Sequence, residues 1–386
     1  MLYFSKLKIV VIYFIIIFLS IFSFINFIDQ KDNFFLSKKV NLGLDLQGGS
    51  YLLLEVNSEP IVDRNLQEKL LKLRKYFKAN KIKYKNIKLK NDKINFQLSK
   101  NDINKFDEFF LNKENSINAY YNLYRSYEMD HSIVELDNSS STESLITIAY
   151  TKYGLIEVKN STLDQSLEIV RRRIDEVGTN EPTIIKRGND RILIELPGLD
   201  DPNRIKNLLG KTANLTFRLV SEAESDFGSE LLSYENSEIQ LNISKRILLS
   251  GDNLINAKPS FDNQNNETTV NFSLDRVGSK KFAKATTQNV GKRLAIILDN
   301  KIMSAPTIKE PILGGNGVIT GNFTFQSATD LALLLRSGAL PAPLTIIEER
   351  TVGPDLGEDS IKAGAISLAI GFLLVIFYML YKYRKL

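Results

Sequence analysis

The sequence contains no cysteine, no tryptophan and one histidine, His131, among 386 residues. Without cysteine, the chain has no disulfide bonds, thiolate metal sites, iron–sulfur clusters or cysteine nucleophile. A single imidazole is too few for a multi-histidine metal centre and leaves a serine triad one possible base. Because His131 stands in an acidic, loop-like stretch of the sequence, we expect it to be a surface residue. We therefore expect no metal, no cofactor and no enzyme active site.

The sequence also has little excess of one charge over the other, because the formal net charge is only +5. The excess lies at the two ends, in Lys6, Lys8, Lys382, Arg384 and Lys385, and the chain between them is neutral. A protein that binds nucleic acid clusters its cations on a folded domain. The sequence thus argues against nucleic acid as a partner.

Two long uncharged apolar runs cover residues 9–28 and 363–381. About 20 helical residues cross a bilayer, so each run predicts a transmembrane helix. The first run could instead be a cleaved signal peptide, but it is longer than the usual apolar region of one, and no alanine precedes Ala79 to supply a cleavage site. The flanking cations predict that both termini are cytoplasmic and that residues 29–362 lie across the membrane.

The second run differs from the first in its small residues. Ala363, Ser367 and Gly371 recur every four positions and predict a helix face that another span can approach closely. Neither run contains an ionisable side chain other than tyrosine. A proton relay needs acidic or basic groups at depth, so we expect none in these two spans.

The region between the runs alternates helices and strands, which predicts an α+β class. The clearest helix is 163–177, with a capping box at Thr162 and Gln165 and a stop at Gly178. An opening strand at Tyr51 and the order helix, hairpin, helix, strand predict a ferredoxin-like sandwich. The later members of that order are 163–177, 182–196, 201–209 and 213–219.

Further elements follow the same rules. Residues 57–150 predict a small α+β unit whose second half is irregular, and 221–261 predict short helices and loops. A hairpin turns at Asp299 and Asn300, and Ser327 begins a helix that Gly338 ends. The remaining expected elements are a strand at 268–274, a helix at 277–288 and a last strand at 344–352.

Two segments look like ligand sites at first. The glycine-rich stretch 43–49 lacks the lysine and the following helix of a phosphate loop, so we interpret it as a tight turn that needs positive φ. Arg171, Arg172 and Arg173 could clamp an anion. We favour a solvated helix face, with Arg171 paired to Asp175 and Arg172 to Glu176 four residues on.

Five blocks of the chain resemble the SecD/SecF family of bacterial protein-export membrane subunits, and the resemblance covers nearly the whole chain. They are 40–56, 163–184, 191–220, 291–308 and 333–361. The first block contains the LGLDLxGG signature, and the last contains GPDLG. The structural motif residues that follow from these blocks are Gly43, Asp45, Gln47, Gly48, Gly49, Gly353, Pro354 and Gly357.

The resemblance implies a periplasmic ferredoxin-like base with an inserted head, flanked by two transmembrane helices of the inner membrane. Its expected organisation is a cytoplasmic end (1–8), a span (9–28), base (29–57), an extra α+β segment (57–150), base (151–220), head (221–344), return strand and linker (345–362), a span (363–381) and a cytoplasmic end (382–386).

The resemblance also implies a function. Family members act with SecF beside the SecYEG channel, often with YajC, and use the proton-motive force to draw unfolded secretory polypeptides outward. Family members continue through further spans that carry the acidic groups tied to proton use, and this sequence stops at Leu386. We therefore expect that the chain alone does not couple to protons. A membrane-anchored scaffold and an anchored enzyme of unknown substrate are the alternatives.

Overall fold

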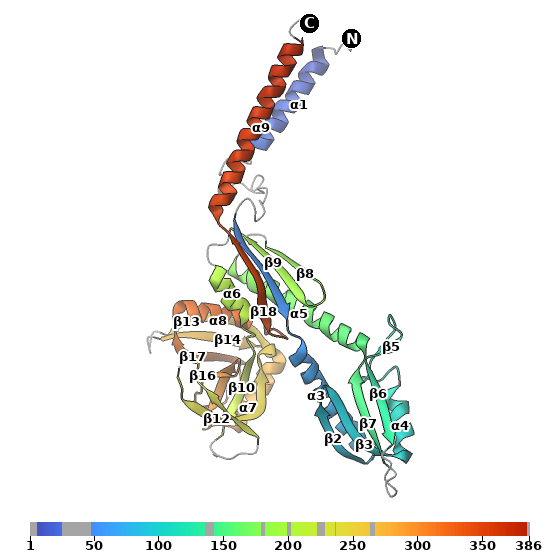
Figure 1. Ribbon diagram of the computed structural model, residues 1–386. Coiled ribbons are helices and arrows are strands. Elements are labelled where there is room, and N and C mark those ends of the chain that lie inside the picture. Colours follow the sequence, from blue (N-terminus) through green and yellow to red (C-terminus); the bar gives the residue numbers. More distant parts are fainter. Residues whose placement is uncertain are drawn as a thin grey trace. The chain divides into compact units, whose positions relative to one another are not determined.

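The computed structural model describes residues 6–24, 48–135, 143–178, 182–198, 202–221, 228–235, 237–262 and 267–383 (Figure 1). The chain divides into two compact units. One contains residues 1–49 and 352–386, and the other contains residues 50–351.

The first unit contains two long helices, α1 (Lys6–Phe24) and α9 (Pro354–Tyr383). Among the described residues, one stretch is long and apolar enough to cross a membrane, Asp359–Lys382 in α9. The apolar part of α1, Val10–Ser20, is shorter, and residues 25–28 of the expected first span lie outside the described residues. Helix α9 begins at Pro354, so residues 354–362, which we expected to link the last strand to the second span, are helical.

The larger unit begins with a four-stranded sheet in the order β18-β1-β9-β8. Helices α5 and α6 pack their apolar sides on it, and the shared core contains Leu52, Leu54, Val170, Ile194 and Leu209. The strands are β1 (Gly49–Val56), β8 (Thr183–Arg187), β9 (Arg191–Pro197) and β18 (Leu344–Val352), and the helices are α5 (Lys152–Val177) and α6 (Pro202–Gly210).

Helix α5 begins ten residues before the predicted capping box, which is therefore wrong. Its N-cap is Thr151, whose side chain accepts a hydrogen bond from Gly154 N. Thr162 lies inside the helix, and its hydroxyl donates to the carbonyl of Val158 at 2.7 Å. The predicted end is confirmed, because Gly178 adopts the left-handed conformation with φ of 81°.

Residues 59–150 form an α+β segment with a hydrophobic core of its own. In that core Phe77, Phe96, Phe106 and Phe110 are fully buried. Its sheet has the order β2-β3-β7-β6. The elements are α3 (Glu59–Ala79), β2 (Tyr84–Lys90), β3 (Lys93–Ser99), α4 (Lys100–Phe110), β4 (Tyr120–Tyr121), β5 (Ser126–Tyr127), β6 (Met129–Glu135) and β7 (Glu143–Tyr150).

The expectation that His131 is a surface residue is wrong. It lies on β6, where its ring packs edge-on against Phe106 and Phe110. Its Nε2 is 2.9 Å from an oxygen of Asp107, and only 11% of its side chain is exposed. The half-buried ring thus packs between strand and helix.

The rest of the unit contains a five-stranded sheet in the order β11-β12-β10-β15-β16 and a three-stranded sheet in the order β13-β14-β17. Helices α7 and α8 pack into a common core with these sheets, around Phe217, Phe272 and Phe282. The elements are β10 (Leu215–Val220), β11 (Ser229–Ser233), β12 (Gln240–Ser250), β13 (Leu254–Asp262), β14 (Glu267–Leu274), α7 (Arg276–Gln288), β15 (Leu294–Leu298), β16 (Lys301–Ser304), β17 (Asn316–Phe323) and α8 (Phe325–Ser337).

Two expectations for this region are wrong. Residues 221–261 contain strands β11, β12 and β13 where we expected short helices and loops. The predicted strand near 213–219 exists as β10, but it pairs with β12 and β15 and is absent from the four-stranded sheet. The strands pair across long sequence distances, which local patterns do not specify.

Candidate functional site

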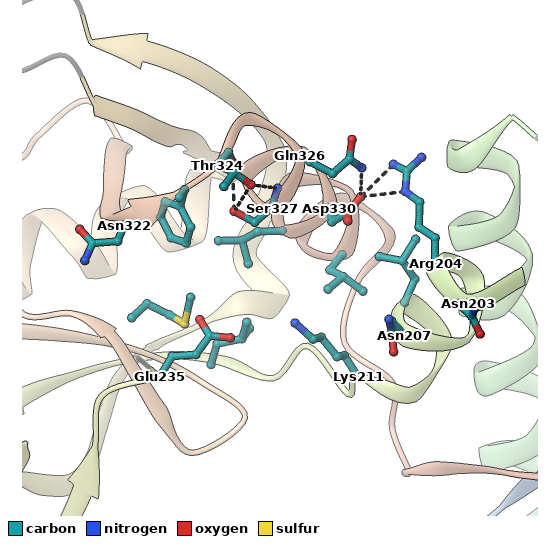
Figure 2. Close-up of a pocket in the computed structure, with 16 residues that line it drawn as sticks. Asn203, Arg204, Asn207, Lys211, Glu235, Asn322, Thr324, Gln326, Ser327 and Asp330 are labelled. Atoms are coloured by element: carbon teal, nitrogen blue, oxygen red, sulfur yellow. Dashed lines mark hydrogen bonds and ion pairs between the residues drawn. The ribbon is translucent and has the colours of Figure 1, made fainter. Parts of the chain in front are cut away.

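A groove of about 680 Å³ lies between α6, the start of α8 and the ends of β16 and β17 (Figure 2). This volume is typical of ligand sites. Apolar side chains from five elements, α6, β15, β16, β17 and α8, form its floor. They are Leu208, Leu298, Met303, Phe323, Leu331 and Leu334.

The rim of the groove is made of amide and hydroxyl side chains. Asn203 and Asn207 come from α6, and Asn322 and Gln326 come from the other side (Figure 2). An amide side chain both donates and accepts hydrogen bonds, as a peptide group does. The rim can therefore pair with the backbone of a bound chain, whatever that chain's sequence.

Charges in the groove are nearly balanced. Arg204 Nη2 lies 2.8 Å from Asp330 Oδ1, and Gln326 Nε2 donates to the same oxygen at 3.0 Å (Figure 2). Lys211 and Glu235 supply one further charge of each sign. The groove thus has no strong preference for a ligand of either charge.

The start of α8 is capped at the edge of this groove. Thr324, not the predicted Ser327, is the N-cap, and its hydroxyl oxygen accepts from Ser327 N at 3.1 Å. The predicted end of this helix at Gly338 is confirmed. The cap defines the first turn of α8, which contains Gln326.

Beneath the groove, Arg173 of α5 is 1% exposed, and its hydrogen-bond partners within the described residues are backbone carbonyls. Its guanidinium donates to the carbonyls of Leu208 at 2.7 Å, Lys211 at 2.5 Å, Thr212 at 3.2 Å and Gly338 at 3.3 Å. Burial lowers the pKa of Arg173 to about 10, and the Asp299 carboxylate acts in the opposite direction. The side chain therefore stays charged at neutral pH and joins the ends of α6 and α8 to α5.

Asp299 organises the connection from α6 to β10. Its carboxylate accepts from Ala213 N at 3.0 Å, from Asn214 N at 2.8 Å and from the Thr212 hydroxyl. Leu340 N donates to Thr212 O at 2.8 Å, so the outgoing and returning chains meet at one place. The predicted hairpin turn is confirmed here, because Asp299 and Asn300 both have positive φ.

The expected pairing of the arginine run is wrong in each case. Arg171 and Arg172 both lie near Glu168, one turn back along α5, at 3.5 Å. Glu176 instead forms a two-pronged pair with Arg336 of α8, at 2.5 and 3.2 Å. Arg336 also donates to the carbonyl of Ala257 at 2.8 Å. Neither an anion clamp nor a wholly solvated face describes these residues.

The motif residues predicted from the sequence lie far from this groove in the chain. Gly48 and Gly49 have φ of 69° and 135°, which a tight turn before β1 requires. Gly353 is exposed before α9, and Pro354 and Gly357 lie in its first turn. Ala363, Ser367 and Gly371 are exposed on α9. Gly43, Asp45 and Gln47 lie outside the described residues.

Three family models match successive parts of the chain. They are the SecD/SecF GG motif at residues 34–59, the N-terminal part of the P1 domain of the SecDF protein translocase subunit at 163–222, and the SecDF P1 head subdomain at 229–342. The protein translocase subunit SecD of Rickettsia conorii is 42% identical over 373 residues, which cover 94% of this chain and 68% of the relative. The chain belongs to the SecD family. It spans about two thirds of the length of such relatives.

Further similarities agree with SecD membership. SecD of Acetobacter pasteurianus is 40% identical over 355 residues, or 90% of this chain and 66% of the relative. A crystal structure of SecDF in its super-membrane-facing form is 25% identical, with a TM-score of 0.50, and covers 98% of this chain and 40% of its own. SecD membership makes the chain an accessory subunit of the Sec protein-export machinery in the inner membrane.

SecD family segments also locate the groove. Its α6 side lies in the 163–222 match, and its floor from β15 onward lies in the head match. Sequence reasoning identified no groove residue, because the floor and rim come from five elements with no common motif.

Proposed function

We propose that the groove holds an unfolded secretory polypeptide on the periplasmic side while the Sec machinery exports it. The observation that carries this proposal is an apolar floor within a rim of amide groups, which suits an extended chain of any sequence. SecF, the SecYEG channel and YajC are the proposed partners. The proposed role is binding only and requires no catalytic residue.

We also propose the finer architecture expected of the family. The strand order β18-β1-β9-β8 supports a ferredoxin-like base, since in chain order it corresponds to strands four, one, three and two of a βαββαβ unit with α5 and α6 as its helices. The segment 59–150 and the head would then be insertions into this base. The proposed domain boundaries are those expected from the sequence.

The proposed topology has two spans, 9–28 and 363–381, with both termini in the cytoplasm. The face formed by Ala363, Ser367 and Gly371 would contact a span of another subunit. Proton use requires ionisable groups within the membrane. These two runs contain none apart from tyrosine, so we propose that the proton-dependent step is supplied by other spans.

Site-specific crosslinking tests the groove. A photoreactive residue at Asn207 or Gln326, both exposed on the rim, should capture a stalled secretory chain. The matched control is Ile185, which is 49% exposed on β8 away from the groove. Equal capture from all three positions would contradict the proposal.

A charge on the groove floor should weaken polypeptide binding. Met303→Glu places a carboxylate among the apolar floor residues, and its desolvation should lower the affinity about tenfold. Fluorescence anisotropy with a labelled unfolded polypeptide and the full chain in detergent measures this. Met303→Leu is the control, because it keeps volume and polarity and should change the affinity less than twofold. An unchanged affinity in Met303→Glu would place the binding site elsewhere, and assembly with SecF should survive both substitutions.

A further inference from the structure

A second hollow of about 460 Å³ lies between β12 and α7, on the part of the chain matched by the head model. Leu219, Leu248 and Ala285 form an apolar, partly buried floor. Ser244, Gln288 and Asn289 add polar groups. None of these residues lines the groove described above.

The rim of this hollow is cationic. Arg246 comes from β12, and Lys281 and Lys284 come from α7. No Asp or Glu lines the hollow among the described residues, which leave out Glu222, Glu224 and Asp226 in the chain before β11. Within the same described part of the chain, none of the three cations has a carboxylate within ion-pair distance.

Three arginines elsewhere in this unit are each paired with a carboxylate. Arg218 lies 2.6 Å from Glu230, Arg204 pairs with Asp330, and Arg336 pairs with Glu176. The three cations on the hollow differ from these arginines in having no such pair among the described residues.

Helix α7 concentrates positive charge, with Arg276, Lys280, Lys281 and Lys284 and no acidic residue within its bounds. Like charges three and four residues apart on a helix repel each other. The nearest acid, Asp275, caps the helix and accepts from Gly278 N at 2.5 Å. That hydrogen bond, with Lys281 as a lesser cause, holds the pKa of Asp275 below its usual value. Asp275 offsets only part of the repulsion among the cations of α7, and an anionic ligand in the hollow would offset more of it.

We propose that this hollow binds acidic side chains of the translocating polypeptide, a role that rests on the proposed function of the groove. Three cations around an apolar floor are complementary to a stretch in which Asp or Glu alternates with apolar residues. The groove has balanced charges and so treats polypeptides of either charge alike. The hollow would add a preference for acidic segments.

The test uses the full chain in detergent and two labelled peptides of the same length. One alternates Leu with Glu and Asp, and the other replaces those acids with Gln and Asn. K281Q/K284Q removes two cations of the hollow and should weaken binding of the acidic peptide roughly fivefold. R276Q/K280Q removes the same charge from the same helix outside the hollow and should change it less than twofold. The loss should shrink at high salt because the contacts are electrostatic.

Three results would overturn the proposal. They are an unchanged affinity in K281Q/K284Q, an equal loss in both double variants, and displacement of the acidic peptide by inorganic phosphate at an ionic strength where chloride has no effect. The last result would assign the hollow to phosphate groups. The neutral peptide has no acids for the hollow, so its binding reports on the groove alone. If the neutral peptide fails to bind, the groove proposal fails, whatever the acidic peptide does.

Discussion

Replacement of Arg173 by methionine should lower the free energy of unfolding of the 50–351 unit by about 3–5 kcal/mol. The guanidinium satisfies four carbonyls, those of Leu208, Lys211, Thr212 and Gly338, in a site that is 1% exposed. Methionine fills a similar volume but donates no hydrogen bond, so acceptors in a dry site lose their partner. Urea unfolding of the full chain in detergent, followed by circular dichroism, measures the change.

The control is Arg172→Met on the same helix. Arg172 is 59% exposed at the side chain, and its pair with Glu168 is screened by water. Its removal should change the free energy of unfolding by less than about 0.5 kcal/mol. Similar effects of the two substitutions would show that the carbonyl cage around Arg173 does not hold this junction together.

Replacement of Lys69 by methionine should cost about 3–5 kcal/mol in the 59–150 segment. Lys69 Nζ lies 2.6 Å from Glu128 Oε2 and 2.7 Å from the carbonyl of Ile117, and both charged side chains are 11% exposed. The substitution leaves the Glu128 carboxylate buried without its cation. Desolvation, with Glu128 a lesser cause, already raises the pKa of Tyr121 to about 12, so this surrounding disfavours a lone negative charge.

A double-mutant cycle distinguishes the pair from simple packing. Lys69→Met combined with Glu128→Leu removes both charges and should recover a large part of the loss, because no unpaired charge remains. Lys72→Met, at an exposed position of the same helix, should be nearly neutral. Additive losses in the double variant would contradict the assignment of the cost to an unpaired carboxylate.

The sequence predicted those elements whose signals are local. The helix stops at Gly178 and Gly338 and the turn at Asp299 and Asn300 need only a few adjacent residues, and the structure has all of them. The start of α5 was misplaced because Thr162 and Gln165 imitate a capping box within a longer helix. A local pattern cannot report that the helix has already begun.

Long-range pairing could not be predicted in this way. Strand β10 follows α6 directly but pairs with β12 and β15, so its sheet is decided by residues more than 20 positions away. Arg173 stands in a run of three arginines, and only the fold distinguishes the one that is buried. The groove was missed for the same reason, since its floor is assembled from distant segments.

The position of β18 beside β1 has a consequence for biogenesis. These strands are neighbours in one sheet, yet nearly all of the 50–351 unit lies between them in sequence. Contacts of such separation form late, and chains emerge from the N-terminus first. The four-stranded sheet therefore stays incomplete until the last strand before α9 has been synthesised. During that interval β1 offers a free edge, so the nascent subunit should depend on chaperones until it closes its own sheet.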